Sequence, residues 1–164
     1  MDANNMLEDK RSRKIALVAH CILNQNSRVF GLAEKSSVIA EIVEFLTHND
    51  MGIIQMPCPE LTYAGILRKS QTKNQYDDAK FRSHCKKIAE EIVAQIQEYI
   101  KGKIKTKIVI GVDGSPSCGV TDSGILIEEL QSILKKKGLT VPFHGIRYER
   151  LSEDIAKLKN LIRD

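Results

Sequence analysis

Apolar residues along the chain follow two different spacings, and the alternation between them predicts strands and helices in turn. Short runs of consecutive apolar or β-branched residues are typical of strands buried on both faces, and they occur at 14–20, 52–56, 108–112 and 141–146. After each run, apolar residues recur every three or four positions, as on one face of a helix. The pattern predicts an α/β fold, a small Rossmann-like parallel sheet of about four strands with helices on both faces.

Side chains that accept hydrogen bonds precede three of the predicted helices, whose first turns leave backbone N–H groups unpaired. Ser36 or Ser37 is expected to cap the first helix. Asp77 or Asp78 is expected to open the second and longest helix, and Ser152 to cap the last one. These residues set the expected boundaries of the helical segments.

The 164 residues are expected to form one domain, because this length is sufficient to bury a hydrophobic core. Hydrophobic residues make up 42% and charged residues 28%, which is ordinary for a globular protein. Residues 1–12 are polar and are predicted to form an N-terminal tail, with a single α/β domain over 13–164. Pro142 cannot donate a backbone hydrogen bond, so its strand is expected at an edge of the sheet.

The charge pattern argues against nucleic-acid and membrane partners. The formal charge of +4 comes largely from lysines at 101–107 and 135–137, next to predicted helix ends, where cations favour the helix dipole. No nucleic-acid-binding motif accompanies these lysines, and aromatic residues are only 5% of the chain. No apolar run is long enough to span a membrane, and the N-terminus lacks a signal-peptide core. A cytoplasmic protein is therefore expected. The sequence does not choose between a monomer and a homodimer.

Three of the four cysteines come after predicted strands. Cys21 directly follows the first strand, Cys58 comes shortly after the second, and Cys118 comes after the third. The carboxyl ends of parallel strands share one edge of a sheet, where α/β proteins place their sites, so these thiols are expected to converge. Cytoplasmic thiols stay reduced, which favours metal-binding, catalytic or packing roles over disulfides. Cys85 lies within a predicted helix and is assigned to packing or to a partly exposed helix face.

Three converging thiolates leave several functions open. Structural zinc takes four ligands, commonly in closely spaced cysteine pairs, and no such pair is present. A [4Fe–4S] cluster is ordinarily held by four thiolates, so three would leave one iron with an open position that suits a thiocarbonyl substrate. The spacing does not choose between iron–sulfur and zinc. A thiol-redox protein without metal and three separate packing roles are further alternatives.

Three short motifs carry a resemblance to a known family: His20-Cys-Ile-Leu-Asn24, Cys58-Pro-Glu60 and Ser115-Pro-Ser-Cys-Gly119. Together, in this order and each after a strand, they resemble the thiouracil desulfidase family and, within it, the branch of related desulfidases. The resemblance spans roughly residues 14–147. It implies a [4Fe–4S] cluster bound by Cys21, Cys58 and Cys118, with the fourth iron free.

The resemblance also implies an activity, the removal of sulfur from a small thiolated compound such as 2-thiouracil. The sulfur would bind the free iron, water would attack the carbon, and hydrosulfide would leave without net redox change. The alternative is a non-catalytic iron–sulfur or zinc protein that senses, stores or delivers sulfur or metal. Asn24 and Phe30 stand where the family has Gly and Asp, so thiouracil serves only as a placeholder for the substrate.

Glu60 and Ser115 match motif positions that could activate water or hydrogen-bond the substrate, and they are the predicted catalytic residues. The structural alternative for Glu60 is a helix cap or an ion pair with Arg68. Ser117 is predicted to contact the substrate, or else to donate hydrogen bonds to cluster sulfides.

Arg28 and His20 complete the predicted substrate-binding residues. Arg28 could hold an anionic substrate or neutralise cluster charge, and a surface salt bridge is the alternative. His20, next to Cys21, could carry a proton, and a hydrogen bond to the backbone is the alternative.

Overall fold

The computed structural model describes residues 9–163, which form an α/β fold around one parallel sheet. The sheet has the order β2-β1-β3-β4, with all neighbours parallel: β1 (Lys14–Val18), β2 (Gly52–Gln55), β3 (Lys105–Val112) and β4 (Phe143–Ile146). The predicted fold class is thus confirmed. The strand that follows Pro142 lies at an edge, as expected. Of the predicted tail, residues 1–8 lie outside the described part of the chain.

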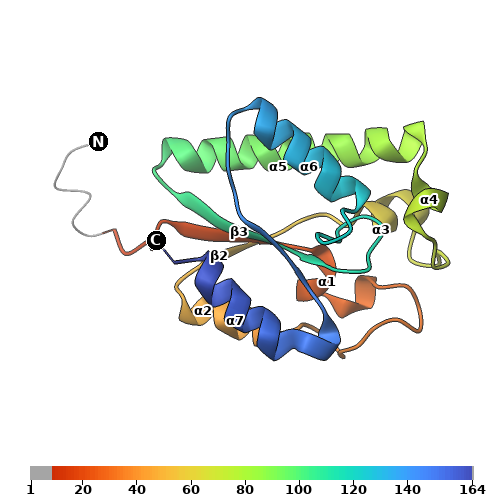
Figure 1. Ribbon diagram of the computed structural model, residues 1–164, viewed down its shortest axis with the longest axis horizontal. Helices are drawn as coiled ribbons and strands as arrows, with labels where there is room; N and C mark the ends of the chain where they lie inside the picture. Colours follow the sequence, from red (N-terminus) through yellow and green to blue (C-terminus); the bar gives the residue numbers. More distant parts are fainter. Residues whose placement is uncertain (1–8, 164) are drawn as a thin grey trace.

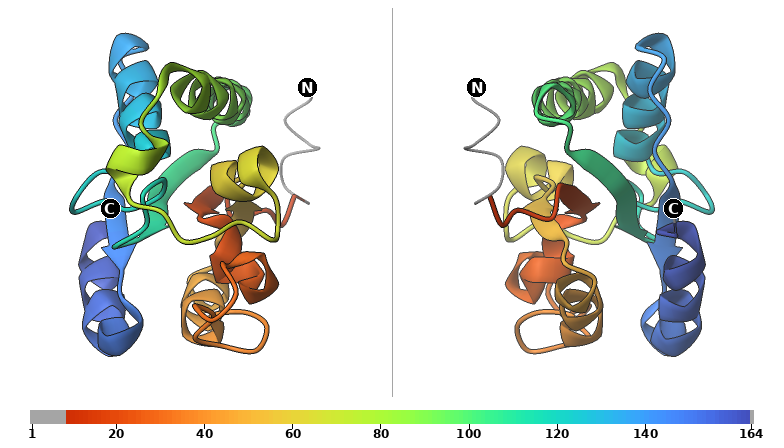
Figure 2. Two further views of the ribbon diagram at one scale, coloured as in Figure 1. Left: turned by 90° about the vertical axis from the view of Figure 1, so that its right-hand side faces the viewer. Right: turned by 90° about the vertical axis from the view of Figure 1, so that its left-hand side faces the viewer.

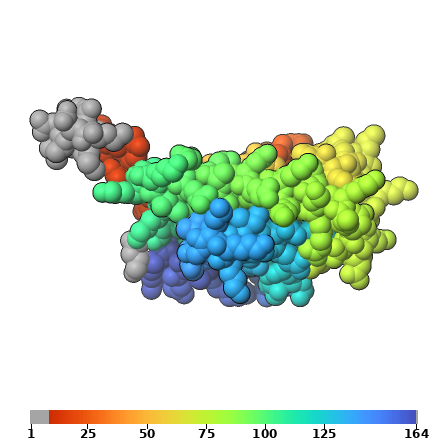
Figure 3. Space-filling view, turned by 90° about the horizontal axis from the view of Figure 1, so that it is seen from above, coloured from red at the N-terminus to blue at the C-terminus, as the bar shows by residue number. Residues whose placement is uncertain are grey.

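Helices cover both faces of the sheet (Figure 1). On one face lie α5 (Ala79–Lys101) and α6 (Ile125–Lys136), and on the other lie α2 (Ala40–His48) and α7 (Leu151–Leu161). Figure 2 shows the same two layers along the sheet, and Figure 3 shows α5 and α6 side by side on the outer surface. The long helix α5 buries one stripe of side chains at helical spacing: Phe81, Cys85, Ile88, Ala89, Ile92, Val93 and Ile96.

The start of α5 agrees with the sequence, and the start of α7 does not. The Asp78 side chain caps α5 by accepting a hydrogen bond from the Phe81 backbone N–H at 2.8 Å. Helix α7 begins at Leu151, and the predicted cap Ser152 is an exposed residue within its first turn. The buried Asp154 fixes this start, because its carboxylate accepts the Arg147 N–H at 2.8 Å at the end of β4.

Helix α2 also begins later than the sequence predicts. Its first residue follows Ile39, and neither Ser36 nor Ser37 caps it. The backbone before α2 is instead paired with the segment after β1: the Gln25 N–H donates to the Ser37 carbonyl at 2.6 Å, and the Ile39 N–H donates to the Ile22 carbonyl at 2.9 Å. These long-range bonds hold the two serines outside the helix.

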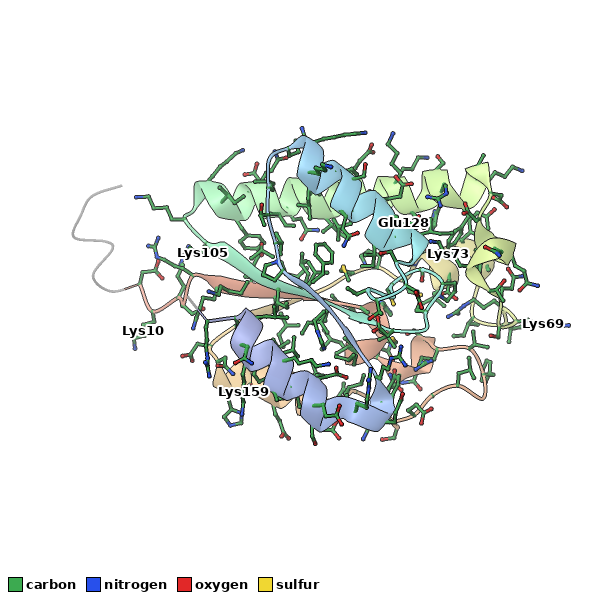
Figure 4. All side chains as sticks on the ribbon, viewed as in Figure 1. Lys10, Lys69, Lys73, Lys105, Glu128 and Lys159 are labelled. Carbon is green, nitrogen blue, oxygen red and sulfur yellow. The ribbon has the colours of Figure 1, made fainter. Side chains whose placement is uncertain are left out.

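The segment between β2 and α5 contains two short helices that the sequence pattern did not predict, α3 (Pro59–Ala64) and α4 (Lys73–Tyr76). A reciprocal cap between the Thr72 and Gln75 side chains starts α4. Lys73 then forms an ion pair with Glu128, which ties α4 to α6 (Figure 4). Short polar helices of this kind show no apolar periodicity, so only their caps could have indicated them.

The segments that follow the strands gather at one end of the molecule. Here lie α1 (His20–Leu23), η2 (Gln25–Ser27), α3 and η3 (Tyr148–Arg150). Figure 1 shows α1, α3 and α4 together at this end. Within residues 9–163, no helix is long and apolar enough to cross a membrane.

Candidate functional site

A cavity of about 260 Å³ opens at the carboxyl ends of β1, β2 and β3. This is the end at which parallel α/β sheets place their ligands. The residues lining it come from all three segments after these strands and from η3. All eight residues that the sequence singled out are among them: His20, Cys21, Arg28, Cys58, Glu60, Ser115, Ser117 and Cys118.

Cys21 lies in the one-turn helix α1. Two residues, Ala19 and His20, separate it from the end of β1 at Val18, whereas the sequence predicted that it follows the strand directly. Backbone contacts fix this turn on both sides. The Ala19 N–H donates to the Ile110 carbonyl of β3 at 2.8 Å, and the Gln55 side chain donates to the His20 carbonyl at 2.8 Å. The backbone after β1 is therefore bonded to both neighbouring strands, β2 and β3, and these bonds fix the position of Cys21 at the cavity.

Cys58 is the N-cap residue of α3. Its sulfur accepts a hydrogen bond from the Leu61 N–H at 3.4 Å, as an oxygen does in other N-caps. Pro59 occupies the first helical position, where a missing N–H costs nothing and the fixed φ favours the turn. These two features hold the cysteine at the cavity wall and place Glu60 one residue into the helix.

Cys118 is held by a loop that folds back on β3. The chain turns at Gly114, whose φ of +89° is costly for other residues, and the Ser115 N–H then donates to the Val112 carbonyl at 3.1 Å. The Ser115 hydroxyl accepts the Cys118 N–H at 3.1 Å, while the Cys118 carbonyl accepts the Val112 N–H at 3.2 Å. A β-carbon at Gly111 would lie only 1.9 Å from that carbonyl oxygen, so the close approach requires glycine there.

The Glu60 carboxylate joins two of these segments across the cavity. The Ser117 hydroxyl donates to its Oε2 at 2.7 Å, and the Ser115 hydroxyl lies 3.5 Å from the same oxygen. Its other oxygen lies 3.9 Å from Nε of Arg68, whose side chain is 5% exposed. The arginine is itself fixed by donating to the Ser27 carbonyl at 2.9 Å. Glu60 therefore forms the ion pair with Arg68 that the sequence offered as its structural alternative. It also contacts Ser115 and Ser117, the two serines predicted for the site.

Burial dominates the chemistry of the three half-buried thiols. It raises the pKa of Cys21 to about 11 and that of Cys118 to about 12, and it raises the pKa of Cys58 as well. Repulsion among the three thiolates adds to the effect, since Cys58 acts on Cys21, and both act on Cys118. Three thiolates would therefore be costly here without a cation to share their charge.

Cys21, Cys58 and Cys118 all line the cavity, and Cys85 does not. In the part of the chain from 9 to 163, no three His, Cys, Asp or Glu side chains form a group that could hold one metal ion. All four cysteines are free thiols. Cys85 is fully buried in α5 and is not among the described residues that line the cavity, which confirms a packing position rather than an exposed one.

His20 and Arg28 both line the cavity, and none of the described residues forms with Arg28 the salt bridge that the sequence offered as an alternative. Burial lowers the pKa of His20, and the neighbouring Met56 backbone acts in the opposite direction; both residues line the cavity. The Arg28 guanidinium lies 4.9 Å from the centre of the Tyr148 ring. Its buried Nη1 has no hydrogen-bond partner among the described residues. Arg28 therefore keeps an unused donor next to the cavity wall.

Sequence reasoning missed three residues that shape the site, Gln25, Asp113 and Tyr148. The buried Gln25 links the Cys21 carbonyl to the Tyr148 hydroxyl. Asp113 accepts the Val120 and Thr121 N–H groups at 2.9 and 3.0 Å and so closes the loop that carries Cys118. Asp113 and Tyr148 each follow a strand closely, which is the signal that could have indicated them.

The family of the chain follows from comparison with known sequences. A family described as "Putative 2-thiouracil desulfurase" matches residues 13–127. The chain belongs to this family. The match contains Cys21, Cys58 and Cys118, and it confirms the resemblance that the three motifs indicated.

Two individual proteins are similar to this member of the 2-thiouracil desulfurase family, one in sequence and one in structure. The uncharacterized protein MJ0003 of Methanocaldococcus jannaschii is 42% identical over 148 residues, covering 90% of this chain and 93% of that protein. A solved structure of the [4Fe-4S]-dependent thiouracil desulfidase TudS has a TM-score of 0.50 and 18% identity, covering 90% of this chain and 99% of that one. At 18% identity, this structural match shows that the two proteins have a similar fold. The family match ends before β4, so η3 and α7 lie beyond it.

Proposed function

We propose that this protein is a [4Fe–4S]-dependent desulfidase that removes sulfur from a small thiolated compound. The observation that carries the proposal is the cavity itself, which is lined by Cys21, Cys58 and Cys118 together with Glu60 and Ser115. Membership of the 2-thiouracil desulfurase family supports the same chemistry. The [4Fe-4S] dependence named for TudS, which covers most of this chain, supports the choice of cofactor.

The donor set fits an iron–sulfur cluster better than a single ion. Thiolates are the ligands of iron–sulfur clusters, and each one binds a different iron, so the ligands stand around an extended body. Structural zinc ordinarily takes four ligands, and the cavity is lined by three cysteines, which supports this choice over structural zinc. The raised pKa values of the thiols are a further support, because they disfavour the free thiolate that metal-free redox chemistry needs.

When bound, a cluster with three protein ligands supplies an iron with an open position, a Lewis acid for the thiocarbonyl sulfur. The protein's own residues handle water and protons. Glu60 is positioned to take a proton from the attacking water, since Ser117 and Arg68 hold its two oxygens. Ser115, already turned toward Glu60, can hydrogen-bond the substrate. Water supplies the oxygen of the new C=O bond, the C=S bond breaks, and sulfur leaves as hydrosulfide without electron transfer.

The cofactor is tested by purifying the full chain without oxygen and measuring iron, sulfide and the visible spectrum. We expect about four irons and four sulfides per chain. Separate Cys21→Ser, Cys58→Ser and Cys118→Ser substitutions should abolish most of the iron content. Cys85→Ser is the matched control and should keep it. Colourless wild-type protein with stoichiometric zinc, or iron loss in the control, would contradict the proposal.

The activity is tested with 2-thiouracil as the probe, by measuring hydrosulfide release from the iron-loaded protein. Glu60→Gln should lower the turnover number roughly 100-fold or more, the usual range for a general base, while the iron content stays unchanged. Glu34→Gln is the control, because Glu34 lines the same cavity with an exposed side chain. Equal turnover in both variants would remove Glu60 from the mechanism, and iron loss in Glu60→Gln would make its role structural.

A further inference from the structure

Tyr148 reaches the cavity from the far end of the sequence. It begins η3, directly after β4, and its half-buried ring lines the cavity beside Cys21 and Arg28. It lies outside residues 13–127, which the family match covers. The role proposed above for the three cysteine segments does not use it, so its contacts need a separate explanation.

The neighbouring Gln25 determines which way the tyrosine hydroxyl can act. Gln25 is 1% exposed, and its Oε1 accepts two backbone N–H groups, from Glu34 at 3.1 Å and Lys35 at 3.3 Å. Its Nε2 must therefore be the donor at the other end, to the Cys21 carbonyl at 2.8 Å and to the Tyr148 hydroxyl oxygen at 2.9 Å. Since the hydroxyl oxygen accepts from Gln25, its own proton is available to a different acceptor.

Cys21 lies next to this hydroxyl, because its carbonyl accepts from the same Gln25 amide group and both residues line the cavity. Burial raises the pKa of the Cys21 thiol, and the neighbouring Arg28 charge and Tyr148 side chain act in the opposite direction. The Arg28 guanidinium lies over the tyrosine ring, 4.9 Å from its centre. The ring is thus held from two sides, by Gln25 at its hydroxyl and by Arg28 at its face.

We propose that Tyr148 is a positioning residue that donates a hydrogen bond to the Cys21 sulfur, with Gln25 and Arg28 holding the tyrosine in place. The inference rests on the proposed function, because the sulfur it orients is a proposed cluster ligand. A donor at a ligating sulfur spreads the negative charge of the thiolate, and this favours the reduced state of the cluster. The segment after β4 therefore completes a site whose ligands all come from the first three strands.

The experiment uses the full chain loaded with iron and sulfide without oxygen, and it measures the reduction potential of the bound cluster. Tyr148→Phe removes only the hydroxyl oxygen and keeps the ring that Arg28 covers. We expect a more negative potential at an unchanged melting temperature and near-normal iron content. Tyr99→Phe is the matched control, because Tyr99 is a half-buried tyrosine of α5 and is not among the described residues lining the cavity. Its potential should equal that of the wild type.

A second variant separates hydrogen bonding from packing. Difluorotyrosine placed at position 148 retains the hydroxyl and makes it a stronger donor, so the potential should move in the opposite direction, to a more positive value. A Tyr148→Phe potential equal to that of the wild type, or shifts of the same sign in both variants, would overturn the inference and leave the proposed function standing. Wild-type protein that binds no cluster would instead refute the proposed function.

Discussion

The contact between β3 and the loop that carries Cys118 can be tested by one added methyl group. A Gly111→Ala substitution places a β-carbon 1.9 Å from the Cys118 carbonyl oxygen and 3.1 Å from Cγ2 of Val120. The first distance is far below the 3.0 Å that real β-carbons keep, and its partner is backbone rather than a flexible side chain. The loop must therefore move away from the strand.

The magnitude follows from three contributions. Overpacking of this kind costs about 1–3 kcal/mol, and loss of the Val112 to Cys118 backbone bond costs about 1 kcal/mol. Replacing glycine in a strand offsets about 0.5–1 kcal/mol of this. The net destabilisation is therefore about 2 kcal/mol, which for a chain of this length lowers the melting temperature by roughly 4–8 °C.

Thermal unfolding followed by circular dichroism measures this change, and Gly52→Ala is the matched control. Gly52 lies in β2 of the same sheet, and a β-carbon there would meet the Ile15 side chain at an ordinary 3.5 Å. The control should melt at or slightly above the wild-type temperature. The displaced loop should also lower iron retention in Gly111→Ala alone. If both variants melt together and hold equal iron, the close approach does not position Cys118.

Three further outcomes are expected. Ser117→Ala removes a buried hydrogen bond to Glu60 and should cost about 1.5–3 kcal/mol in chemical denaturation; an unchanged midpoint would argue against that bond. Asp78→Ala removes the cap of α5 and should cost about 1 kcal/mol, whereas Ser36→Ala, in a residue that caps no helix, should cost nothing measurable. For Asp113, burial favours a higher pKa, but hydrogen bonds from Thr121 and Val120 outweigh it and hold the pKa below the ordinary 3.8. The stability that this carboxylate contributes is complete above pH 3.8 and is lost as the pH falls through its lowered pKa. Asp113→Asn should therefore make the free energy of unfolding less dependent on pH in the acid range. An unchanged dependence would contradict the assignment.

The order of strands and helices could be read from the sequence because each element has its own apolar period. The four strands and the helices α2, α5, α6 and α7 all lie where that period predicts them, within a few residues. The errors occur where long-range contacts override local signals. Ser37 and Ser152 both look like caps, but backbone pairing with Gln25 in one case and the buried Asp154 in the other set the helix starts. Gln25 belongs to the segment after β1, and Asp154 acts through its bond to Arg147, seven residues earlier, so a cap pattern at Ser37 or Ser152 contains neither contact.

The same division applies to the candidate site. That Cys21, Cys58 and Cys118 would share a cavity followed from parallel strands alone, since their carboxyl ends share one edge. Which side chains would touch the cysteines did not follow. The sequence offered Arg68 only as an alternative partner for Glu60, and it gave no indication that Tyr148 would stand beside Cys21.

The sequence by itself determined the architecture, the edge of the sheet where the thiols meet, and the family to which the chain belongs, because local periodicity and short motifs carry that information. Only the tertiary structure decided how closely the loops approach and which polar groups meet in the cavity. The physical reason is that a hydrogen bond such as that between Ser117 and Glu60, or between Gln25 and Tyr148, depends on angles and distances to a fraction of an ångström. The two residues of the first pair lie 57 positions apart in the sequence, and those of the second pair lie 123 positions apart. No local sequence pattern encodes the distance between them.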